Sequence, residues 1–283
     1  MATFHKLIIG DCSNMHEIQD ECIDLVLTSP PYFNAPFDYN DLFDSYSSYL
    51  NFLKNVAVEI YRVLKQGRVV VINIDDMLVN SEKFPIVADC TKIFQEVGLR
   101  YRDRIIWKKP EGYLRISKRS GILLQHPYPM YYYPDNLLES ILIFQKGKFD
   151  YKSISKDKKE ASIINKKEFL NNKWYMSLWE MTNVLPNSDL EKGIAAFPEE
   201  LAYRIIKLFS YVDDIVLDPF VGSGTTMKVA RLLGRNSIGI EIKKELISII
   251  KEKIGFGKQK ILQSEHDSFE IIIRKQFEHE SVC

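Results

Sequence analysis

The amino-acid sequence predicts a doubly wound α/β fold, in which helices cover both faces of a mostly parallel β-sheet. Seven short runs rich in Val, Ile and Leu are typical of strands that are buried on both faces of such a sheet. Helical patterns lie between many of these runs, and strands that alternate with helices indicate parallel βαβ units. A chain of 283 residues suits one large domain or a domain with a substantial insertion.

Each predicted strand is a short apolar run. In chain order the runs are Lys6–Ile9, Ile23–Thr28, Arg68–Ile74, Arg104–Trp107, Ser140–Gln145, Ile215–Asp218 and Asn236–Glu241. A further strand is expected at Phe269–Ile273, within a C-terminal extension over residues 255–283.

Each predicted helix repeats apolar residues every three or four positions. The four helices are predicted over Tyr49–Leu64, Pro85–Val97, Pro198–Phe209 and Thr225–Leu233. Gly67, Gly98 and Gly234 follow three of them as stop signals, and Pro198 opens the remaining one.

Two segments interrupt the alternation of strands and helices. Residues 109–136 are rich in Pro, Tyr and basic residues, and residues 146–195 are rich in Lys and Asn, while residues 138–146 return to the sheet. The chain holds 38 basic and 38 acidic side chains, yet residues 100–173 hold 17 Lys and Arg against 8 Asp and Glu, a net charge of +9. This asymmetry is typical of a nucleic-acid-binding surface. A well-solvated lysine-rich surface would give the same pattern.

Cysteine usage and hydropathy favour a cytoplasmic protein. Cys12, Cys22, Cys90 and Cys283 show no CxxC spacing and do not group with the five histidines, so we expect no metal site. Sparse cysteines suit a reducing compartment. No apolar run approaches the roughly 18 residues of a membrane span, so we expect no membrane partner.

A glycine-rich turn follows the strand Ile215–Asp218 and opens the next helix. The turn reads Asp218-Pro219-Phe220-Val221-Gly222-Ser223-Gly224-Thr225-Thr226. Glycines at such a turn let the backbone approach a ligand, and the helix N-terminus offers free N–H groups. Glu241 ends the next strand, 17 residues beyond Gly224, where a carboxylate typically binds ribose hydroxyls. This order of elements indicates a nucleoside cofactor.

The form of the turn narrows the choice of cofactor. A dinucleotide turn reads GxGxxG, and Met227 stands where the third glycine would be. The chain also lacks a GxxxxGK[ST] sequence, which excludes a P-loop for a nucleoside triphosphate. S-adenosylmethionine has a ribose but no phosphate, so it fits this turn.

A second motif, Ser29-Pro30-Pro31-Tyr32, follows the strand Ile23–Thr28 at its carboxyl end, where open α/β sheets bind ligands. The two prolines fix the backbone and remove two N–H donors, so Ser29 and Pro30 locally present acceptors, a hydroxyl and a carbonyl. Tyr32 adds an aromatic face. A rigid turn that leaves the sheet would give the same sequence.

The two motifs together resemble those of the DNA amino-methyltransferases that use S-adenosylmethionine. Their order resembles that of the circularly permuted β class, in which the recognition region separates the catalytic motif from the cofactor turn. The resemblance covers residues 4–108, 138–146 and 195–250. It implies a seven-stranded methyltransferase sheet with its first two strands moved to the end of the chain. It implies a catalytic half over 1–108 and a cofactor-binding half over 196–254. The basic and aromatic residues of the insertions over 109–195 predict target recognition mainly in 146–195, with 109–136 as a loop near the flipped base.

The resemblance also implies roles for single residues. Ser29, Pro30, Pro31 and Tyr32 would hold the target base, and Glu241 would hold the ribose hydroxyls. The turn would surround the methionine and ribose of the cofactor with Asp218, Pro219, Phe220, Gly222, Ser223, Gly224 and Thr225. Asp11 would lie near the adenine, and Phe197 and Pro198 would lie near the methionine end.

The residue at position 29 bears on which base is methylated. Adenine enzymes of the family usually carry Asp or Asn where this chain has Ser29, and a serine there resembles the cytosine-N4 enzymes. Any of these side chains can accept an amine hydrogen. We therefore expect methylation of cytosine N4, with adenine N6 as the alternative.

The insertions contain the candidate DNA-binding residues, which are Arg115, Lys118, Arg119, Lys156, Lys158 and Lys159. Such side chains neutralise phosphates. Trp174 and Trp179 suit a small core that packs the insertion onto the sheet at least as well as they suit DNA contact.

The expected partner is double-stranded DNA, in a restriction-modification context with a cognate endonuclease that acts on the same site. The sequence is compatible with a monomer and with a homodimer. An RNA methyltransferase and a non-catalytic DNA-binding protein are weaker alternatives, and the missing third glycine makes a nicotinamide oxidoreductase the weakest.

Overall fold

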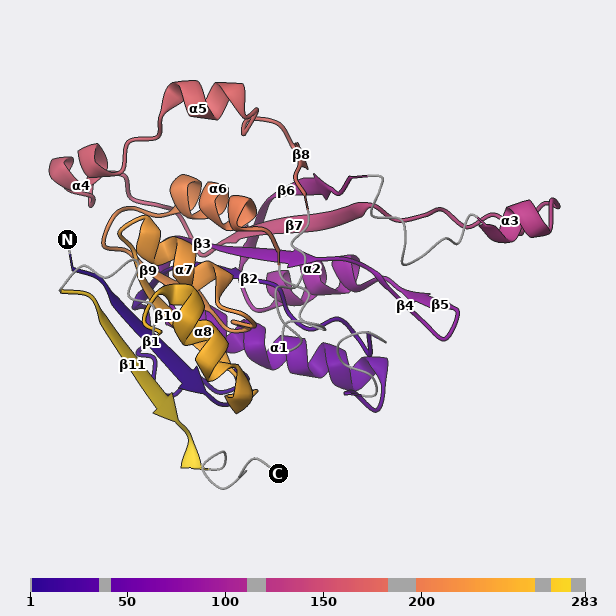
Figure 1. Ribbon diagram of the computed structural model, residues 1–283, viewed down its shortest axis with the longest axis horizontal. Helices are drawn as coiled ribbons and strands as arrows, with labels where there is room; N and C mark the ends of the chain where they lie inside the picture. Colours follow the sequence, from indigo (N-terminus) through magenta and orange to yellow (C-terminus); the bar gives the residue numbers. More distant parts are fainter. Residues whose placement is uncertain (1, 36–41, 111–120, 183–196, 258–265, 276–283) are drawn as a thin grey trace.

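The computed structural model describes residues 2–35, 42–110, 121–182, 197–257 and 266–275. These residues form one large sheet with helices on both faces (Figure 1). Its nine strands lie in the order β11 (Ser268–Ile273), β1 (Phe4–Ile9), β10 (Asn236–Glu241), β9 (Ile215–Asp218), β2 (Ile23–Thr28), β3 (Leu64–Ile74), β7 (Leu138–Gln145), β6 (Arg100–Lys108) and β8 (Leu178–Glu180). Only β7 runs antiparallel to its neighbours among these strands. The predicted α/β class is confirmed.

All seven predicted strands are present, and two more extend the expected seven-stranded sheet to nine. One is β11, the further strand expected near the C-terminus. The other is β8, a three-residue strand that pairs with β6 at the sheet edge and has no sequence pattern of its own. The strand β6 begins at Arg100, earlier than predicted, because its first residues are exposed and mostly charged and thus carry no apolar signal.

The strand order brings distant parts of the chain together. Strands β9 and β10 come from the C-terminal part of the chain, yet they lie between β1 and β2. The strand β2 pairs directly with β9, through Leu25 with Val216 and Val26 with Leu217. The strand that carries the Ser-Pro-Pro-Tyr motif therefore lies beside the strand that carries the glycine-rich turn. The circular permutation remains an interpretation of this order.

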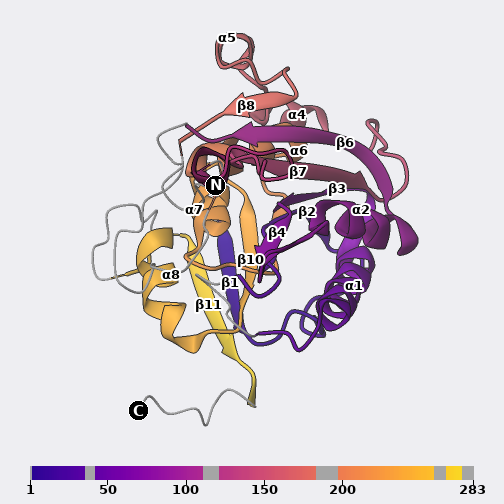
Figure 2. The ribbon, with the colours of Figure 1, turned by 90° about the vertical axis from the view of Figure 1, so that its right-hand side faces the viewer.

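Helices cover the two faces of the sheet in separate layers (Figure 2). One layer consists of α1 (Tyr46–Val63) and α2 (Ile86–Glu96). The other consists of α6 (Glu199–Phe209), α7 (Thr225–Leu232) and, after the short η2 (Lys244–Leu246), α8 (Ile247–Ile254). Alternate strand residues face opposite layers: Val26 packs in the cluster of α1, and Leu27 packs in the cluster of α6. The four predicted helices are present with small shifts at their ends, whereas α8 was not predicted.

The insertions add short helices at the margins of the sheet, namely α3 (Gly121–Gln125), α4 (Lys156–Ala161) and α5 (Lys166–Asn171). A separate hairpin of β4 (Met77–Val79) and β5 (Glu82–Phe84) lies between β3 and α2 in the chain. Figure 1 shows α3 projecting at one end of the molecule and α4 near the other. Trp174 and Trp179 are 3% and 1% exposed, so they pack the insertion onto the sheet. Among the described residues, no helix has the length and apolar content needed to cross a membrane.

Candidate active site

A buried aspartate joins the two sequence motifs. The Thr28 hydroxyl, at the end of β2, donates to Asp218 Oδ1 at 2.6 Å, and the Thr226 hydroxyl donates to Asp218 Oδ2 at 2.6 Å. The backbone N–H of Phe220 also donates to Asp218, at 3.1 Å. Burial raises the pKa of Asp218 to about 6, although these three hydrogen bonds favour its ionised form. Asp218 therefore holds the start of the Ser-Pro-Pro-Tyr motif against the glycine-rich turn.

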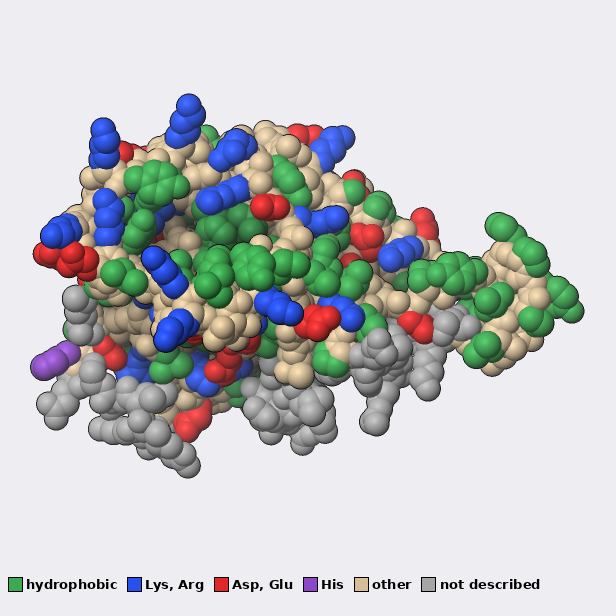
Figure 3. All heavy atoms as spheres, turned by 90° about the horizontal axis from the view of Figure 1, so that it is seen from above, with side chains coloured by type: hydrophobic (Ala, Val, Ile, Leu, Met, Phe, Trp, Pro, Cys, Tyr) green, Lys and Arg blue, Asp and Glu red, His purple; other side chains and the backbone are tan. Residues whose placement is uncertain are grey.

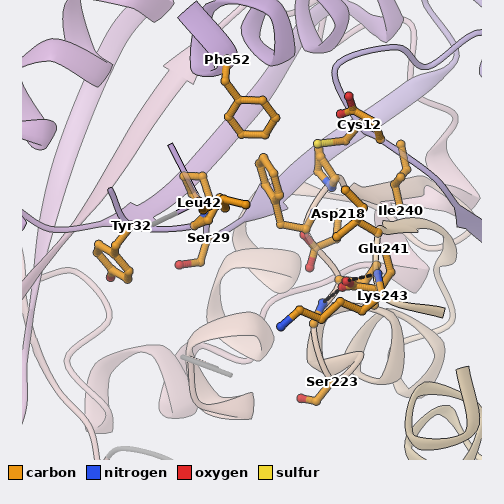
Figure 4. Close-up of a pocket in the computed structure, with 18 of the residues that line it drawn as sticks. Cys12, Ser29, Tyr32, Leu42, Phe52, Asp218, Ser223, Ile240, Glu241 and Lys243 are labelled. Carbon is orange, nitrogen blue, oxygen red and sulfur yellow. Dashed lines mark hydrogen bonds between the residues drawn. The ribbon is translucent and has the colours of Figure 1, made fainter. Parts of the chain in front are cut away.

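A cavity of about 350 Å³ opens where the two motifs meet. Figure 4 shows Ser29 and Tyr32 on one side of it and Glu241 and Lys243 on the other, with Asp218 between them. The predicted residues that line the cavity are Asp11, Ser29, Pro30, Pro31, Tyr32, Phe197, Asp218, Pro219, Phe220, Gly222, Ser223, Thr225 and Glu241. Pro198 and Gly224 are not among the lining residues. The volume lies in the usual range of ligand pockets, about 300–1,000 Å³.

The glycine-rich turn exposes backbone to the cavity. Gly222 and Gly224 have φ angles of +54° and +93°, in the left-handed region that favours glycine. Gly224 is the N-cap of α7, so it shapes the turn without lining the cavity. Lys253 of α8 donates to the hydroxyls of Ser223 and Thr225, at 2.6 and 2.9 Å. These two bonds tie the turn to the helix layer behind it.

Glu241 is held in place by backbone donors. Its Oε2 accepts a hydrogen bond from the N–H of Gly222 and its Oε1 accepts one from the N–H of Lys243, each at 2.9 Å (Figure 4). Glu241 is 8% exposed, and burial raises the pKa of its carboxyl. Each carboxylate oxygen has two lone pairs, so both can accept a further bond from a ligand hydroxyl.

Asp11 lines the cavity and is fixed by a local turn. Its carboxylate accepts bonds from the backbone N–H and the hydroxyl of Ser13, at 2.8 and 2.7 Å. The neighbouring Cys12 lines the same region, and burial raises the pKa of its thiol well above its usual range. The thiol therefore stays protonated and acts as an apolar wall.

Several lining residues were missed in the sequence. They are Gly10, Cys12, Leu42, Phe43, Phe52, Val221, Ile240, Ile242 and Lys243. Phe52 belongs to α1, and its ring centroid lies 5.9 Å from that of Phe220. Phe52 could have been found in the sequence, because a large aromatic residue off the apolar stripe of its helix indicates a contact outside the helix core.

The candidate DNA-binding residues do not gather at the cavity in the described parts of the chain. Arg115, Lys118 and Arg119 lie outside the described residues. Figure 3 shows Lys and Arg side chains on the face that carries α4, α5 and β8. Lys158 of α4 pairs with the buried Asp214 at 2.7 Å. Asp214 precedes β9 at its amino end, whereas the cavity lies at the carboxyl end of that strand, so α4 with its Lys156 and Lys159 sits at the opposite edge of the sheet.

The cavity is lined by Glu241 on one side and by Ser29 and Tyr32 on the other (Figure 4), and two polar groups that face one cavity suit a transferase that brings a cofactor and a substrate together. Residues 23–252 match the model of the N6_N4_Mtase family, described as DNA methylase. The chain belongs to this family and is a DNA methyltransferase that uses S-adenosylmethionine.

Curated relatives match over most of their length. The Type II methyltransferase M.MjaI of Methanocaldococcus jannaschii is 36% identical, over 92% of this chain and 94% of that protein. The Type II methyltransferase M.MthZI of Methanothermobacter thermautotrophicus is 32% identical, over 97% and 84%.

Solved structures share the fold. A DNA modification methylase of Thermus thermophilus, in complex with S-adenosyl-L-methionine, is similar with a TM-score of 0.75 and 27% identity, over 95% of this chain and 98% of that one. The PvuII DNA methyltransferase, described as cytosine-N4-specific, has a TM-score of 0.65 at 19% identity, over 95% and 96%. At 19% identity, the likeness to the PvuII enzyme concerns the fold alone.

The described residues fit S-adenosylmethionine. Glu241 presents two fixed acceptors for ribose hydroxyls, and Gly222 allows close approach of the backbone beside them. The aromatic ring of Phe220 and the side chains of Ile242 and Cys12 give the apolar walls that a planar base needs. When bound, the cofactor supplies an electrophilic methyl group on a sulfonium.

Replacement of Glu241 by glutamine should weaken S-adenosylmethionine binding about 10- to 100-fold, because a hydrogen bond to a charged acceptor contributes about 1.5–3 kcal/mol. Isothermal titration calorimetry measures the change in Kd. Glu245→Gln, at an exposed glutamate just beyond the site, serves as the control and should bind normally. Equal affinities for the Glu241 variant and the control would show that Glu241 does not hold the ribose.

Proposed function

We propose that the enzyme methylates the exocyclic N4 amine of a cytosine flipped out of double-stranded DNA, within a short specific sequence. The observation that carries this proposal is Ser29 in the cavity wall, immediately before Pro30 and beside the cofactor turn. In the family that the motifs resemble, a serine at this position is typical of cytosine-N4 enzymes, and adenine enzymes usually carry Asp or Asn. Adenine N6 is the alternative target.

Ser29 and Pro30 would activate the base amine by accepting its hydrogens. The amine of a base is a poor nucleophile because its lone pair is delocalised into the ring. If the Ser29 hydroxyl oxygen and the Pro30 carbonyl each accept one amine hydrogen, the nitrogen becomes more pyramidal and its lone pair can point at the methyl donor. Fixed acceptors of this kind stabilise the positive charge that develops on the nitrogen during transfer.

Tyr32 would hold the flipped base by stacking. Its side chain lines the cavity, yet it is only 6% exposed, so its ring is packed in place before any base arrives. Enzymes that modify a base within duplex DNA extrude it and read it between aromatic or apolar side chains. A preset aromatic ring beside the acceptors suits that task, and it serves cytosine and adenine alike.

The chemical identity of the product tests the proposal. Unmethylated duplex DNA made by amplification is incubated with the enzyme and S-adenosylmethionine, digested to nucleosides and analysed by mass spectrometry. We expect N4-methylcytosine in reactions that contain DNA, and none when the same sequence is offered as RNA. N6-methyladenine as the only product would replace cytosine by adenine in the proposal, and methylated RNA would overturn the choice of substrate.

We also propose a restriction-modification context, with a cognate endonuclease that acts on the same sequence. The support is that M.MjaI and M.MthZI are named Type II methyltransferases. Sequencing that detects methylated bases should then find one short sequence modified at every occurrence on a plasmid. Methylation scattered over unrelated sequences would contradict this context.

A further inference from the structure

A buried polar cluster lies directly behind Tyr32. At its centre is Glu139, the second residue of β7, which is 9% exposed. Its Oε2 accepts a hydrogen bond from the Tyr32 hydroxyl at 3.2 Å and another from Asn73 Nδ2. Its Oε1 pairs with the Lys109 ammonium. Glu139, Asn73 and Lys109 are not among the lining residues of the cavity, so they reach it only through Tyr32.

The cluster joins four strands at one edge of the sheet. Tyr32 follows β2, Asn73 lies near the end of β3, and Lys109 follows β6, while Glu139 lies near the start of the antiparallel β7. These four ends all lie at the carboxyl edge of the parallel strands, where the cavity opens. Glu139 is thus an acceptor on which donors from the ends of β2, β3 and β6 converge.

Stability alone does not account for this cluster. A buried carboxylate is tolerated only when it is paired, and apolar side chains of similar volume usually serve strand packing equally well or better. Asn73 turns its amide nitrogen to Glu139 and leaves its Oδ1 buried without a hydrogen-bond partner among the described residues. An unpaired buried acceptor costs about 1–3 kcal/mol. Arrangements that lower stability in this way are concentrated at functional sites.

The cluster fixes the orientation of the Tyr32 ring. Burial and the neighbouring Glu139 carboxylate raise the pKa of the Tyr32 hydroxyl well above its usual range, so it stays a donor. A donor bonded to an anchored acceptor restricts rotation of the ring, while Asn73 and Lys109 hold that acceptor from two further sides. A catalytic side chain whose conformation is fixed by a supporting layer loses less entropy when substrate binds.

We propose that Glu139 is a positioning residue for the target base: it holds the Tyr32 ring in the orientation that stacks on the flipped base. This inference rests on the proposed stacking role of Tyr32. Glu139 takes no part in the transfer itself, because its contacts reach Tyr32 and not the acceptors at Ser29 and Pro30. Its effect should therefore depend on the Tyr32 hydroxyl.

A double-mutant cycle tests this dependence. Glu139→Ala should lower kcat/KM for DNA about 10-fold in the wild-type background, a coupling within the 0.5–3 kcal/mol seen for residues in contact. In the Tyr32→Phe background, where the hydroxyl is already missing, the same substitution should lower it less than about 2-fold. A merely structural role predicts the same loss in both backgrounds, because Asn73 and Lys109 lose their acceptor in either case. Equal losses would overturn the proposal.

A second substitution of Glu139 keeps the test valid if the alanine variant does not fold, and a substitution elsewhere serves as the control. Glu139→Gln keeps the shape of the side chain and one carbonyl acceptor. It should therefore fold and lower kcat/KM for DNA about 3-fold, less than the alanine variant does. If the alanine variant does not fold, the glutamine variant replaces it in the cycle. Glu82→Ala, at an exposed glutamate of the nearby hairpin, is the control and should leave kcat/KM unchanged. Affinity for S-adenosylmethionine, measured by calorimetry, should not change in any of them.

The role of Tyr32 itself is measured separately. If Tyr32→Ala kept normal activity on duplex DNA, the stacking role would be wrong and the inference would fall with it. If Tyr32→Ala were inactive while the cycle showed no coupling, only the role of Glu139 would be wrong. Total methyl transfer is the readout, so neither result depends on which base is the target.

Discussion

Replacement of Ser29 by alanine should lower kcat at least about 100-fold, because removal of one preorganised polar group that stabilises transition-state charge typically has an effect of that size. The Ser29 hydroxyl is the side-chain acceptor that the proposed mechanism requires for the target amine, and alanine has none. Binding of S-adenosylmethionine should be unchanged, because Glu241, the proposed acceptor for the ribose hydroxyls, lies on the other side of the cavity (Figure 4).

Single-turnover transfer of a labelled methyl group to DNA measures the chemical step, and calorimetry measures cofactor affinity. Ser153→Ala, at an exposed serine of the insertion, is the matched control and should behave as the wild type. A variant at Ser29 with full kcat would refute the assignment of the hydroxyl as an acceptor. Loss of cofactor affinity in parallel with kcat would instead indicate damage to the cavity as a whole.

The sequence predicted those elements whose signals are local. Every residue of Ile23–Thr28 is buried, and this run was found because strands covered on both faces are apolar throughout. The helix predicted over Pro85–Val97 is observed at Ile86–Glu96, since its apolar residues repeat with the helical period. By contrast, β8 was missed because its assignment depends on pairing with β6.

In the candidate site, too, the sequence predicted residues that belong to local motifs and missed contacts between distant residues. The sequence placed each motif directly after a strand of one parallel sheet, and the hydrogen bond from Thr28 to Asp218 shows that the two motifs meet. Glu139 could not be predicted from the sequence, because it lies 107 residues from Tyr32 and belongs to no motif. Lys158 looked like a phosphate-binding side chain in a basic run, and only the fold shows that it faces Asp214.

An ionic cluster at the amino ends of the strands surrounds Asp214, which is fully buried. Its carboxylate pairs with Arg68 at 2.8 Å and with Lys158 at 2.7 Å, and it accepts a bond from the backbone N–H of Tyr211 at 2.8 Å. Arg68 is itself buried and also pairs with Asp24 at 2.9 Å. The buried charge of the Arg68 guanidinium is therefore compensated by two carboxylates, those of Asp24 and Asp214.

Substitution of Asp214 by asparagine should therefore lower the free energy of unfolding by about 3 kcal/mol or more, the usual effect of breaking a buried ion pair from one side. Chemical denaturation measures it. Asp213→Asn removes the exposed neighbouring charge; since asparagine tolerates the positive φ at that position, this variant should change stability by less than about 0.5 kcal/mol. Because the cluster and the cavity lie at opposite ends of β9, kcat of the folded Asp214 variant should remain near the wild-type value. Normal stability would show that Lys158 and Arg68 do not need Asp214, and would return Lys158 to the candidates for DNA contact.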